Sequence, residues 1–425
     1  MGLAECKSLP EFLEAHRKEE KASFHMPGHK GQAFFTRLGY EGAGMADAAD
    51  LDITEIPGAD DLRHPAGVIK AISDRYSKLY GSRRSFISVN GSSAPIMAAV
   101  MSVTGRGRKI IAASDCHISV QNGIRLAGAE ALYIEPERIG FGGQLHEEEV
   151  SAAPGQISDG DRQGIPGGVS AEKIGALLDK HEDADAVIFP SPNYFGIMSD
   201  VAAAAEEVHR RGRILIVDQA HGAHLKMFSE AYGGAECGAD RSLPAPAEEC
   251  GADIVIDSTH KTMASFTQSA VVNIFGDRVD AEEYEQALLM LESTSPSYIL
   301  MDSLAVNAEI TEEHGSTLAK AWKEDLDCFY SEVVNISGIR ALTRQMVPGG
   351  LFDETKIVLD FSGLGMSGSE AEDALTERGV YPEFCTGTVV MCLTGIGNVR
   401  KDYEILLDAL KDISAAAGRC DHGDK

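Results

Sequence analysis

Short apolar runs alternate with amphipathic stretches over residues 66–275, and this alternation predicts a sheet covered by helices. The predicted strands are Phe86–Val89, Lys109–Ala113, Ala131–Ile134, Ala186–Phe189, Ile214–Val217, Asp253–Asp257 and Ser269–Phe275. The predicted helices are Gly67–Tyr80, Ala94–Val103, Ile118–Ala127, Ala171–Lys180 and Val201–Arg211. Because strands and helices take turns, we expect an α/β fold with a mostly parallel central sheet and helices on both faces.

The pattern differs on either side of this region. Residues 1–22 predict a short amphipathic helix, and the chain is then polar and irregular, so residues 1–65 are interpreted as an N-terminal arm with loops. A mainly helical stretch extends the large domain to 66–334. The remainder predicts a smaller C-terminal α/β domain over 335–425, with a strand, a helix, a strand and a helix at 357–361, 369–378, 389–393 and 398–416.

Each apolar run ends at a cluster of polar residues. In a largely parallel sheet, binding residues gather at the carboxyl ends of the strands. Such ends carry Ser92, His117, Asn193, Asp218, His221 and Lys261. The sequence therefore predicts that these side chains meet in one site.

Lys261 is the main candidate for covalent chemistry. It follows the buried run Asp253–Asp257, where partial desolvation would lower its pKa and free the amine to attack an aldehyde cofactor, above all pyridoxal phosphate. Ser258 and His260 beside it could hold the cofactor's phosphate. A surface lysine at a strand end would give the same local motif, so the decision depends on its partners.

Three other segments could supply those partners. The turn Gly91–Ser93 opens a helix and offers N–H groups and hydroxyls to a phosphate, although a simple serine cap would look the same. Asp218 could pair with a protonated pyridine nitrogen and keep the ring an effective electron sink, or it could cap the next turn. His117 could lie flat against the ring or be an ordinary loop residue.

Composition limits the class of protein. A chain of 425 residues is too long for one ordinary core. No run approaches the roughly 18 to 20 uncharged apolar residues of a membrane helix, and the N-terminus lacks a signal-peptide core, so a cytoplasmic location is expected. The formal charge of −28 argues against nucleic acid and favours cationic ligands, although solubility alone would explain it. The eight cysteines are scattered and indicate no metal site.

Eight motifs occur together: HMPGHKG (25–31), DITE (52–55), NGSSAP (90–95), SDCHIS (114–119), SPNYFGI (191–197), VDQAHGAHL (217–225), DSTHKT (257–262) and STSPSYILMDSL (293–304). In this combination the sequence resembles the Orn/Lys/Arg decarboxylase family over nearly its whole length. The resemblance is closest to the short bacterial forms without an N-terminal wing domain. It implies a fold-type-I enzyme that decarboxylates arginine, lysine or ornithine with pyridoxal 5'-phosphate.

The resemblance also implies roles for individual residues. Lys261 would form the Schiff base with the cofactor, Asp218 would bind the pyridine nitrogen, and His117 would stack on the ring. These three are the predicted catalytic residues. The phosphate and the rest of the cofactor would contact Gly91, Ser92, Ser93, Ala220, His221, Ser258 and His260.

Substrate binding is expected to involve two subunits, because family members work as homodimers with shared active sites. His25, His29 and Ser295 would then complete a neighbour's site, and Glu383 could meet a cationic substrate side chain. One departure concerns this glutamate. The family usually reads E-[MF]-A-D, whereas this chain reads Glu-Phe-Cys-Thr over residues 383–386, so the missing aspartate leaves the choice of basic amino acid open.

Two other functions are compatible with these residues. The same scaffold supports aminotransferases and aldolases, since similarity of fold does not settle the reaction. A non-catalytic homologue that binds the cofactor is the second alternative. For a decarboxylase, the expected products are agmatine, cadaverine or putrescine together with CO2.

Overall fold

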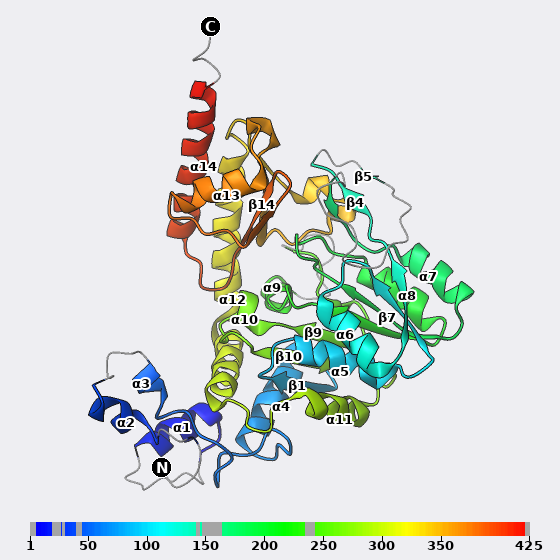
Figure 1. The fold of residues 1–425 in the computed structure, drawn as a ribbon, viewed down its shortest axis with the longest axis vertical. Coiled ribbons are helices and arrows are strands. Elements are labelled where there is room, and N and C mark those ends of the chain that lie inside the picture. The colour runs from blue at the N-terminus through cyan, green and yellow to red at the C-terminus, as the bar shows by residue number, and fades with distance from the viewer. Residues whose placement is uncertain are drawn as a thin grey trace.

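The computed structural model describes residues 6–18, 27, 30–39, 45–141, 145–146, 164–233 and 243–420. Figure 1 shows a large sheet with helices around it and, nearer the C-terminus, a second and smaller sheet. The long helix α12 (Tyr298–Val333) runs between the N-terminal helices and the small sheet.

The large sheet has seven strands and is mostly parallel, as predicted. Its order is β1 (Arg84–Ser88), β10 (Ala270–Ile274), β9 (Ile254–Asp257), β8 (Ile214–Asp218), β7 (Ala184–Pro190), β2 (Lys109–Ala113) and β3 (Glu130–Ile134). The five strands from β9 to β3 are parallel, whereas β10 is antiparallel to both of its neighbours. The chain passes from β9 to β10 through only the single-turn helix α10 (Thr259–Thr262), and this connection is too short for an ordinary helical crossover.

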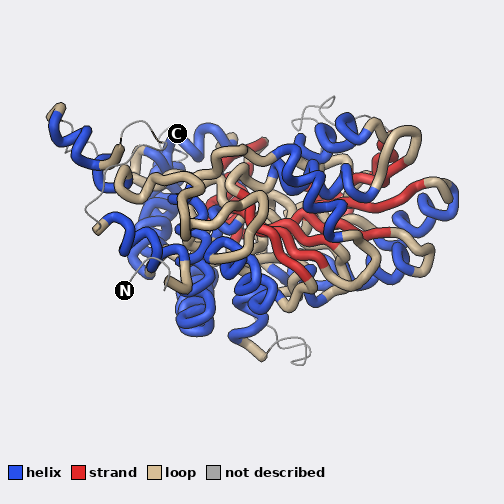
Figure 2. The backbone as a smooth tube through the Cα atoms, turned by 90° about the horizontal axis from the view of Figure 1, so that it is seen from below, coloured by secondary structure: helices blue, strands red, loops and turns tan. Residues whose placement is uncertain are grey.

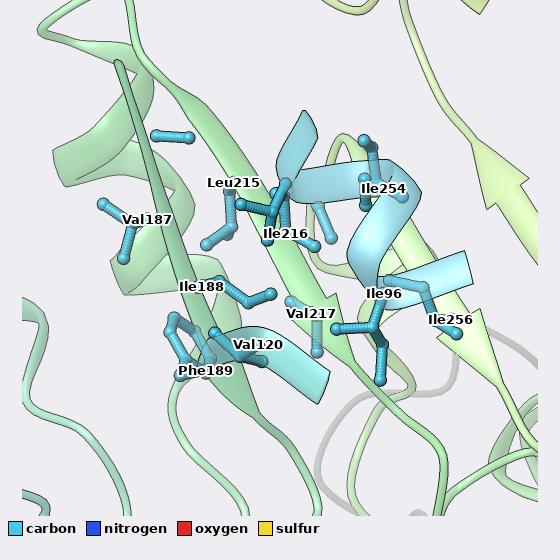
Figure 3. Packing of buried hydrophobic residues seen from close by; sticks show 14 of the residues in the cluster. Ile96, Val120, Val187, Ile188, Phe189, Leu215, Ile216, Val217, Ile254 and Ile256 are labelled. Atoms are coloured by element: carbon cyan, nitrogen blue, oxygen red, sulfur yellow. The ribbon is translucent and has the colours of Figure 1, made fainter. Parts of the chain in front are cut away.

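Helices pack on this sheet and bury its strands (Figure 2). They are α4 (Val68–Tyr80), α5 (Ser93–Val103), α6 (Ile118–Ala127), α7 (Ala171–Lys180), α8 (Val201–His209) and α11 (Ala281–Leu291), whereas α9 (Leu225–Ala231) packs against α12. Ile188, Ile216 and Val217 are fully buried between the layers, as Figure 3 shows. Burial on both faces accounts for the continuous apolar runs in the sequence.

The small sheet is antiparallel, in the order β11 (Arg340–Ala341), β12 (Lys356–Asp360), β14 (Val389–Leu393) and β13 (Phe384–Thr386). Helices α13 (Gly368–Thr376) and α14 (Arg400–Cys420) accompany it. The predicted strands at 357–361 and 389–393 are present. The sequence did not reveal β11 and β13, because strands of two or three residues have too little apolar alternation to be recognised.

The remaining elements are short. Near the N-terminus lie α1 (Leu9–Arg17), α2 (Gln32–Arg37) and α3 (Met45–Ala48), and α1 packs against α12. The helix predicted over 1–22 is thus shorter within the described residues, beginning at Leu9 after the capping residue Ser8. A three-stranded sheet joins β4 (Arg138–Ile139), β5 (Leu145–His146) and β6 (Ile165–Pro166). Residues 151–168 are rich in Gly, Pro and Asp, which predicts a loop, and most of them lie outside the described residues.

Candidate active site

A cavity of ≈ 580 Å³ lies at the carboxyl ends of β7, β8 and β9. It brings together nine of the predicted residues: Gly91, Ser92, Ser93, His117, Asp218, Ala220, His221, His260 and Lys261. The sequence analysis did not assign roles to seven others in its lining: Asn90, Asp115, Pro190, Pro192, Tyr194, Thr267 and Gln268. Five of the six side chains predicted to meet at strand ends therefore line one cavity. The sixth, Asn193, does not: its side-chain amide donates to the Pro166 carbonyl at 3.0 Å and its Oδ1 accepts from the Ile197 amide at 3.0 Å, so it shapes the loop instead.

Lys261 reaches the cavity from α10, the single helical turn that directly follows β9. Its Nζ lies 2.9 Å from Nε2 of His221. Burial lowers the pKa of Lys261, the charge of Asp218 opposes this change, and the charge of Lys356 adds to it. The result is an amine that loses its proton more readily than a solvated lysine and so becomes a better nucleophile.

Asp218 ends β8 and lies in the same cavity. Its carboxylate accepts a hydrogen bond from the Ala220 amide at 3.1 Å. Burial raises the pKa of Asp218, and the positive charge of Lys261 limits the rise. A buried carboxylate with so few donors is ready to pair with a cationic group of a ligand.

The turn before α5 forms another wall of the cavity. Gly91 adopts a left-handed conformation, with φ of 68°, and its amide donates to the Gln268 carbonyl at 2.7 Å. Ser92 is the capping residue of α5, yet its side chain makes no capping hydrogen bond. The hydroxyl and the first amides of the helix are thus placed to bind an anion.

Two residues beside Lys261 extend this anion-binding end. His260 lines the cavity and donates through Nδ1 to the Ser269 carbonyl at 2.7 Å, while burial lowers its pKa and keeps the ring neutral. Ser258 is not among the residues that line the cavity; it is fully buried beside them, and its Oγ has no hydrogen-bond partner among the described residues. A buried hydroxyl without a partner is costly, so a bound phosphate would satisfy it.

His117 and His221 hold fixed positions at the cavity. His117 caps the N-terminus of α6, where its Nδ1 lies 3.3 Å from the Ser119 amide nitrogen and 2.8 Å from the Ser119 hydroxyl. Burial holds the pKa of His221 well below its ordinary value, and the charges of Lys261 and Lys356 lower it further. His221 is therefore a neutral ring beside the lysine amine.

A tyrosine that the sequence analysis did not single out links the cavity to the small sheet. The Tyr194 hydroxyl donates to Oε1 of Glu383 at 3.1 Å, and its ring meets His221 edge-on at 4.7 Å between centroids. Burial and the charge of Glu383 raise the pKa of Tyr194 to about 12, so it remains a donor. The signal was present, since Tyr194 follows the polar cluster at the end of a predicted strand.

Asp115 is a second carboxyl group of the cavity that the sequence analysis passed over. Burial raises its pKa to about 7, and its Oδ1 has no hydrogen-bond partner among the described residues. It precedes His117 by two positions in the motif SDCHIS. Its place directly after a predicted strand was the available signal.

The remaining predicted residues lie elsewhere. Ser295 is exposed in the turn before α12, outside the lining of the cavity, and its amide donates to the Ser293 hydroxyl at 3.1 Å. Glu383 is also exposed and reaches the site through Tyr194. His25 and His29 fall outside the described residues. The substrate roles of all four remain predictions.

Two features are absent from the described part of the chain. It contains no group of three or more His, Cys, Asp or Glu side chains arranged to hold a metal ion. Its helices include none with both the length and the apolar character needed to cross a bilayer.

The chain has the fold of the fold-type-I enzymes. The structure superposes with a TM-score of 0.76 on the Francisella novicida lysine decarboxylase LdcF, at 19% identity, over 97% of this chain and 60% of that one. It also superposes with a TM-score of 0.60 on the Sphingomonas wittichii serine palmitoyltransferase, at 15% identity, over 83% of this chain and 77% of that one. The chain thus spans 60% of the length of the solved lysine decarboxylase.

The family is identified by sequence. A family model described as "Orn/Lys/Arg decarboxylase, major domain" matches residues 8–402, and the chain belongs to this family. It is 29% identical to an arginine decarboxylase of Halalkalibacterium halodurans, over 97% of this chain and 78% of the relative. It is 25% identical to the lysine decarboxylase LdcA of Pseudomonas aeruginosa, over 72% of this chain and 40% of the relative.

Proposed function

We propose that this protein removes the α-carboxyl group of a basic amino acid, with pyridoxal 5'-phosphate held at Lys261. The observation that carries the proposal is the single cavity that contains the Lys261 amine, the buried Asp218 carboxylate and the open N-terminus of α5. The relatives named as arginine and lysine decarboxylases support this reaction over the others of the same fold.

The residues present suit this cofactor. The turn Gly91–Ser93, the unpartnered hydroxyl of Ser258 and the neutral His260 would bind its phosphate. Asp218 would hold a proton on the pyridine nitrogen, which keeps the ring cationic. His117 and Ala220, which line the cavity, would flank the ring. Bound pyridoxal phosphate supplies the electron sink for the pair that remains on the α-carbon when CO2 leaves.

Lys261 would perform two tasks in the reaction. Its amine would hold the cofactor aldehyde until the substrate amine takes its place. The freed amine, kept beside the neutral His221 at 2.9 Å, would then be placed to return a proton to the α-carbon. The walls of the cavity would exclude water from the substrate carboxylate, which favours its loss as neutral CO2.

Recognition of the basic side chain would fall to the acidic rim. Glu383 is held by Tyr194, whose aromatic ring also offers a face or edge to a cation. In a homodimer, His25, His29 and Ser295 of one subunit would complete the site of the other. The substrate is then arginine, lysine or ornithine, since each carries a cation at the end of its side chain.

A CO2-release assay with these three amino acids tests the proposal, with Lys261→Ala as the blank. We expect CO2 and the matching amine from the unmodified protein and neither from the variant, because Lys261 is the only lysine among the described residues that line the cavity. Lys226→Ala is the matched control, since this partly buried lysine pairs with Glu230 and Glu249 away from the cavity. Its turnover should stay within about twofold of the unmodified protein.

The alternatives give different results. Comparable CO2 production by Lys261→Ala would refute the role of this lysine. A keto acid in place of the amine would indicate an aminotransferase. Cofactor trapped on Lys261 by borohydride, with no product from any of the three amino acids, would indicate a homologue that binds the cofactor without turnover.

A further inference from the structure

A second lysine, Lys356 of β12, is fully buried behind the candidate site. It does not line the cavity, yet its Nζ donates to the His221 carbonyl at 2.6 Å. It also donates to Oδ2 of Asp353 at 2.7 Å, and Asp353 is fully buried as well. A completely buried ion pair is costly to desolvate, so its presence next to the site calls for a functional reason.

The pair extends to the helical turn that carries Lys261. Asp353 accepts from Nε2 of the fully buried His224 at 3.2 Å, and Nδ1 of the same ring lies 3.1 Å from the hydroxyl of Thr262. Thr262 is the neighbour of Lys261 in sequence, and its carbonyl accepts from the Ile396 amide at 2.9 Å. The segment that carries Lys261 is thus linked by hydrogen bonds to residues that flank the strands of the small sheet.

The same pair contacts the loop that carries Tyr194. The Asp353 amide donates to the Gly196 carbonyl at 2.8 Å. A methyl group added at Gly196 would lie 2.8 Å from Cγ of Lys356, so the loop and the buried lysine are in close contact. The loops that carry Tyr194, His221 and Lys261 are therefore all connected to one buried ion pair, either directly or through His224.

We propose that Lys356 and Asp353 form a positioning pair, which fixes the loops of His221 and Lys261 and keeps the Lys356 cation behind the Lys261 amine. Two lysines close together disfavour protonation of each other, and this is a recognised way to activate an amine. The inference rests on the proposed role of Lys261, and it assigns to residues outside the cavity the task of preparing that amine.

The charges around each member of the pair agree with this role. Burial lowers the pKa of Lys356, but Asp353 opposes the change. Burial also disfavours the charge on Asp353, but Lys356 and His224 outweigh it and hold the pKa of this carboxyl well below its ordinary value. Burial lowers the pKa of His224, and the charge of Asp353 opposes this change.

Around Lys261 itself, three charged groups act besides burial. Asp218 and Glu383 favour its charged form, whereas Lys356 disfavours it. His221 and His260 are neutral rings because burial lowers the pKa of each. Lys356 is therefore the cation that offsets the two carboxylates, and its removal should raise the pKa of Lys261.

The test measures the protonation of Lys261 directly in the full-length chain. Trace acetylation with acetic anhydride at a series of pH values, read by mass spectrometry of the peptide that contains Lys261, gives the pH midpoint of this amine. The double variant Lys356→Met with Asp353→Asn removes both charges. Because Lys356 is the cation that disfavours protonation of Lys261, we expect the midpoint to rise in this variant.

Two further variants keep the result interpretable. Asp353→Asn alone is nearly isosteric, and the unpaired Lys356 would lose its proton, so the midpoint should move in the same direction. Lys226→Met removes a different paired lysine, which is partly buried and does not contribute to the pKa shift of Lys261. This variant should leave the midpoint unchanged. Circular dichroism would confirm that each variant is folded.

An unchanged midpoint in both the double variant and the folded Asp353→Asn variant would overturn the inference, and so would an equal shift in Lys226→Met. The proposed function has a separate readout. Addition of pyridoxal phosphate followed by borohydride should leave a mass increment on the peptide with Lys261. Absence of that increment, with the acetylation midpoint still shifted, would count against the proposed function while the effect of the pair on the amine stands.

Discussion

The bond between Tyr194 and Glu383 allows a sharp test of substrate recognition. In Tyr194→Phe the ring keeps its edge-on contact with His221, but the donor to Glu383 at 3.1 Å is lost. A hydrogen bond to a charged group contributes about 1.5–3 kcal/mol when buried. Tyr194 is 44% exposed and Glu383 is exposed too, so screening reduces this to about 1 kcal/mol.

An effect of about 1 kcal/mol corresponds to about a fivefold change in affinity. We therefore expect KM for the preferred basic amino acid to rise about fivefold in Tyr194→Phe, with kcat within twofold, because the bond orients Glu383 and touches no reacting atom. Steady-state assays of CO2 release would measure both constants. The pKa of about 12 for Tyr194 means that the effect should be the same from pH 6 to pH 9.

Tyr381→Phe is the matched control, since Tyr381 is 81% exposed and lies close to Glu383 in sequence. It should leave KM unchanged. Glu383→Gln should reduce the preference for arginine over its neutral analogue citrulline, because the carboxylate is what distinguishes them. The reasoning would be refuted if Tyr194→Phe lowered kcat and left KM unchanged, or if Tyr381→Phe raised KM by the same factor.

Two predictions concern stability. Glu292 accepts a hydrogen bond from the Ser88 hydroxyl, and burial raises its pKa from 4.5 to about 7. The folded state therefore holds the proton of Glu292 more tightly than the unfolded state, and the resulting stabilisation is full below pH 4.5 and is lost as the pH rises towards 7. Glu292→Gln should therefore raise the free energy of unfolding by about 2–3 kcal/mol at pH 8 and by much less at pH 5, measured in urea; equal gains at both pH values would contradict this. Gly196→Ala would place a methyl group 2.9 Å from the Asp353 carbonyl oxygen at a φ of 83°, and it should lower the free energy of unfolding by about 2–4 kcal/mol. Gly81→Ala has a similar φ of 69° but open space around the new methyl group, so it should lower the free energy of unfolding by about 1 kcal/mol. Thermal melting that showed equal losses in the two glycine variants would rule out a steric cause.

Much of the site was predictable because it depends on local sequence patterns. The strand at 109–113 and the helix at 118–127 have the predicted bounds. The spacing of apolar residues marks both elements, and Gly128, which adopts the left-handed conformation, ends the helix. Asp218 and Lys261 were assigned to one site because carboxyl ends of parallel strands share one edge of a sheet. These inferences need only the order of elements along the chain.

Contacts between distant segments could be known only from the tertiary structure. Tyr194 meets Glu383 across the boundary between the two sheets, and nothing near either residue in sequence indicates the other. Lys356 is an ordinary lysine at the start of a predicted strand, and it is buried only because the small sheet packs against the loop of His221. The spacing of apolar residues along the sequence thus determined which segments are buried. Which polar groups face one another was decided by the packing of segments far apart in sequence, because that packing depends on the whole chain.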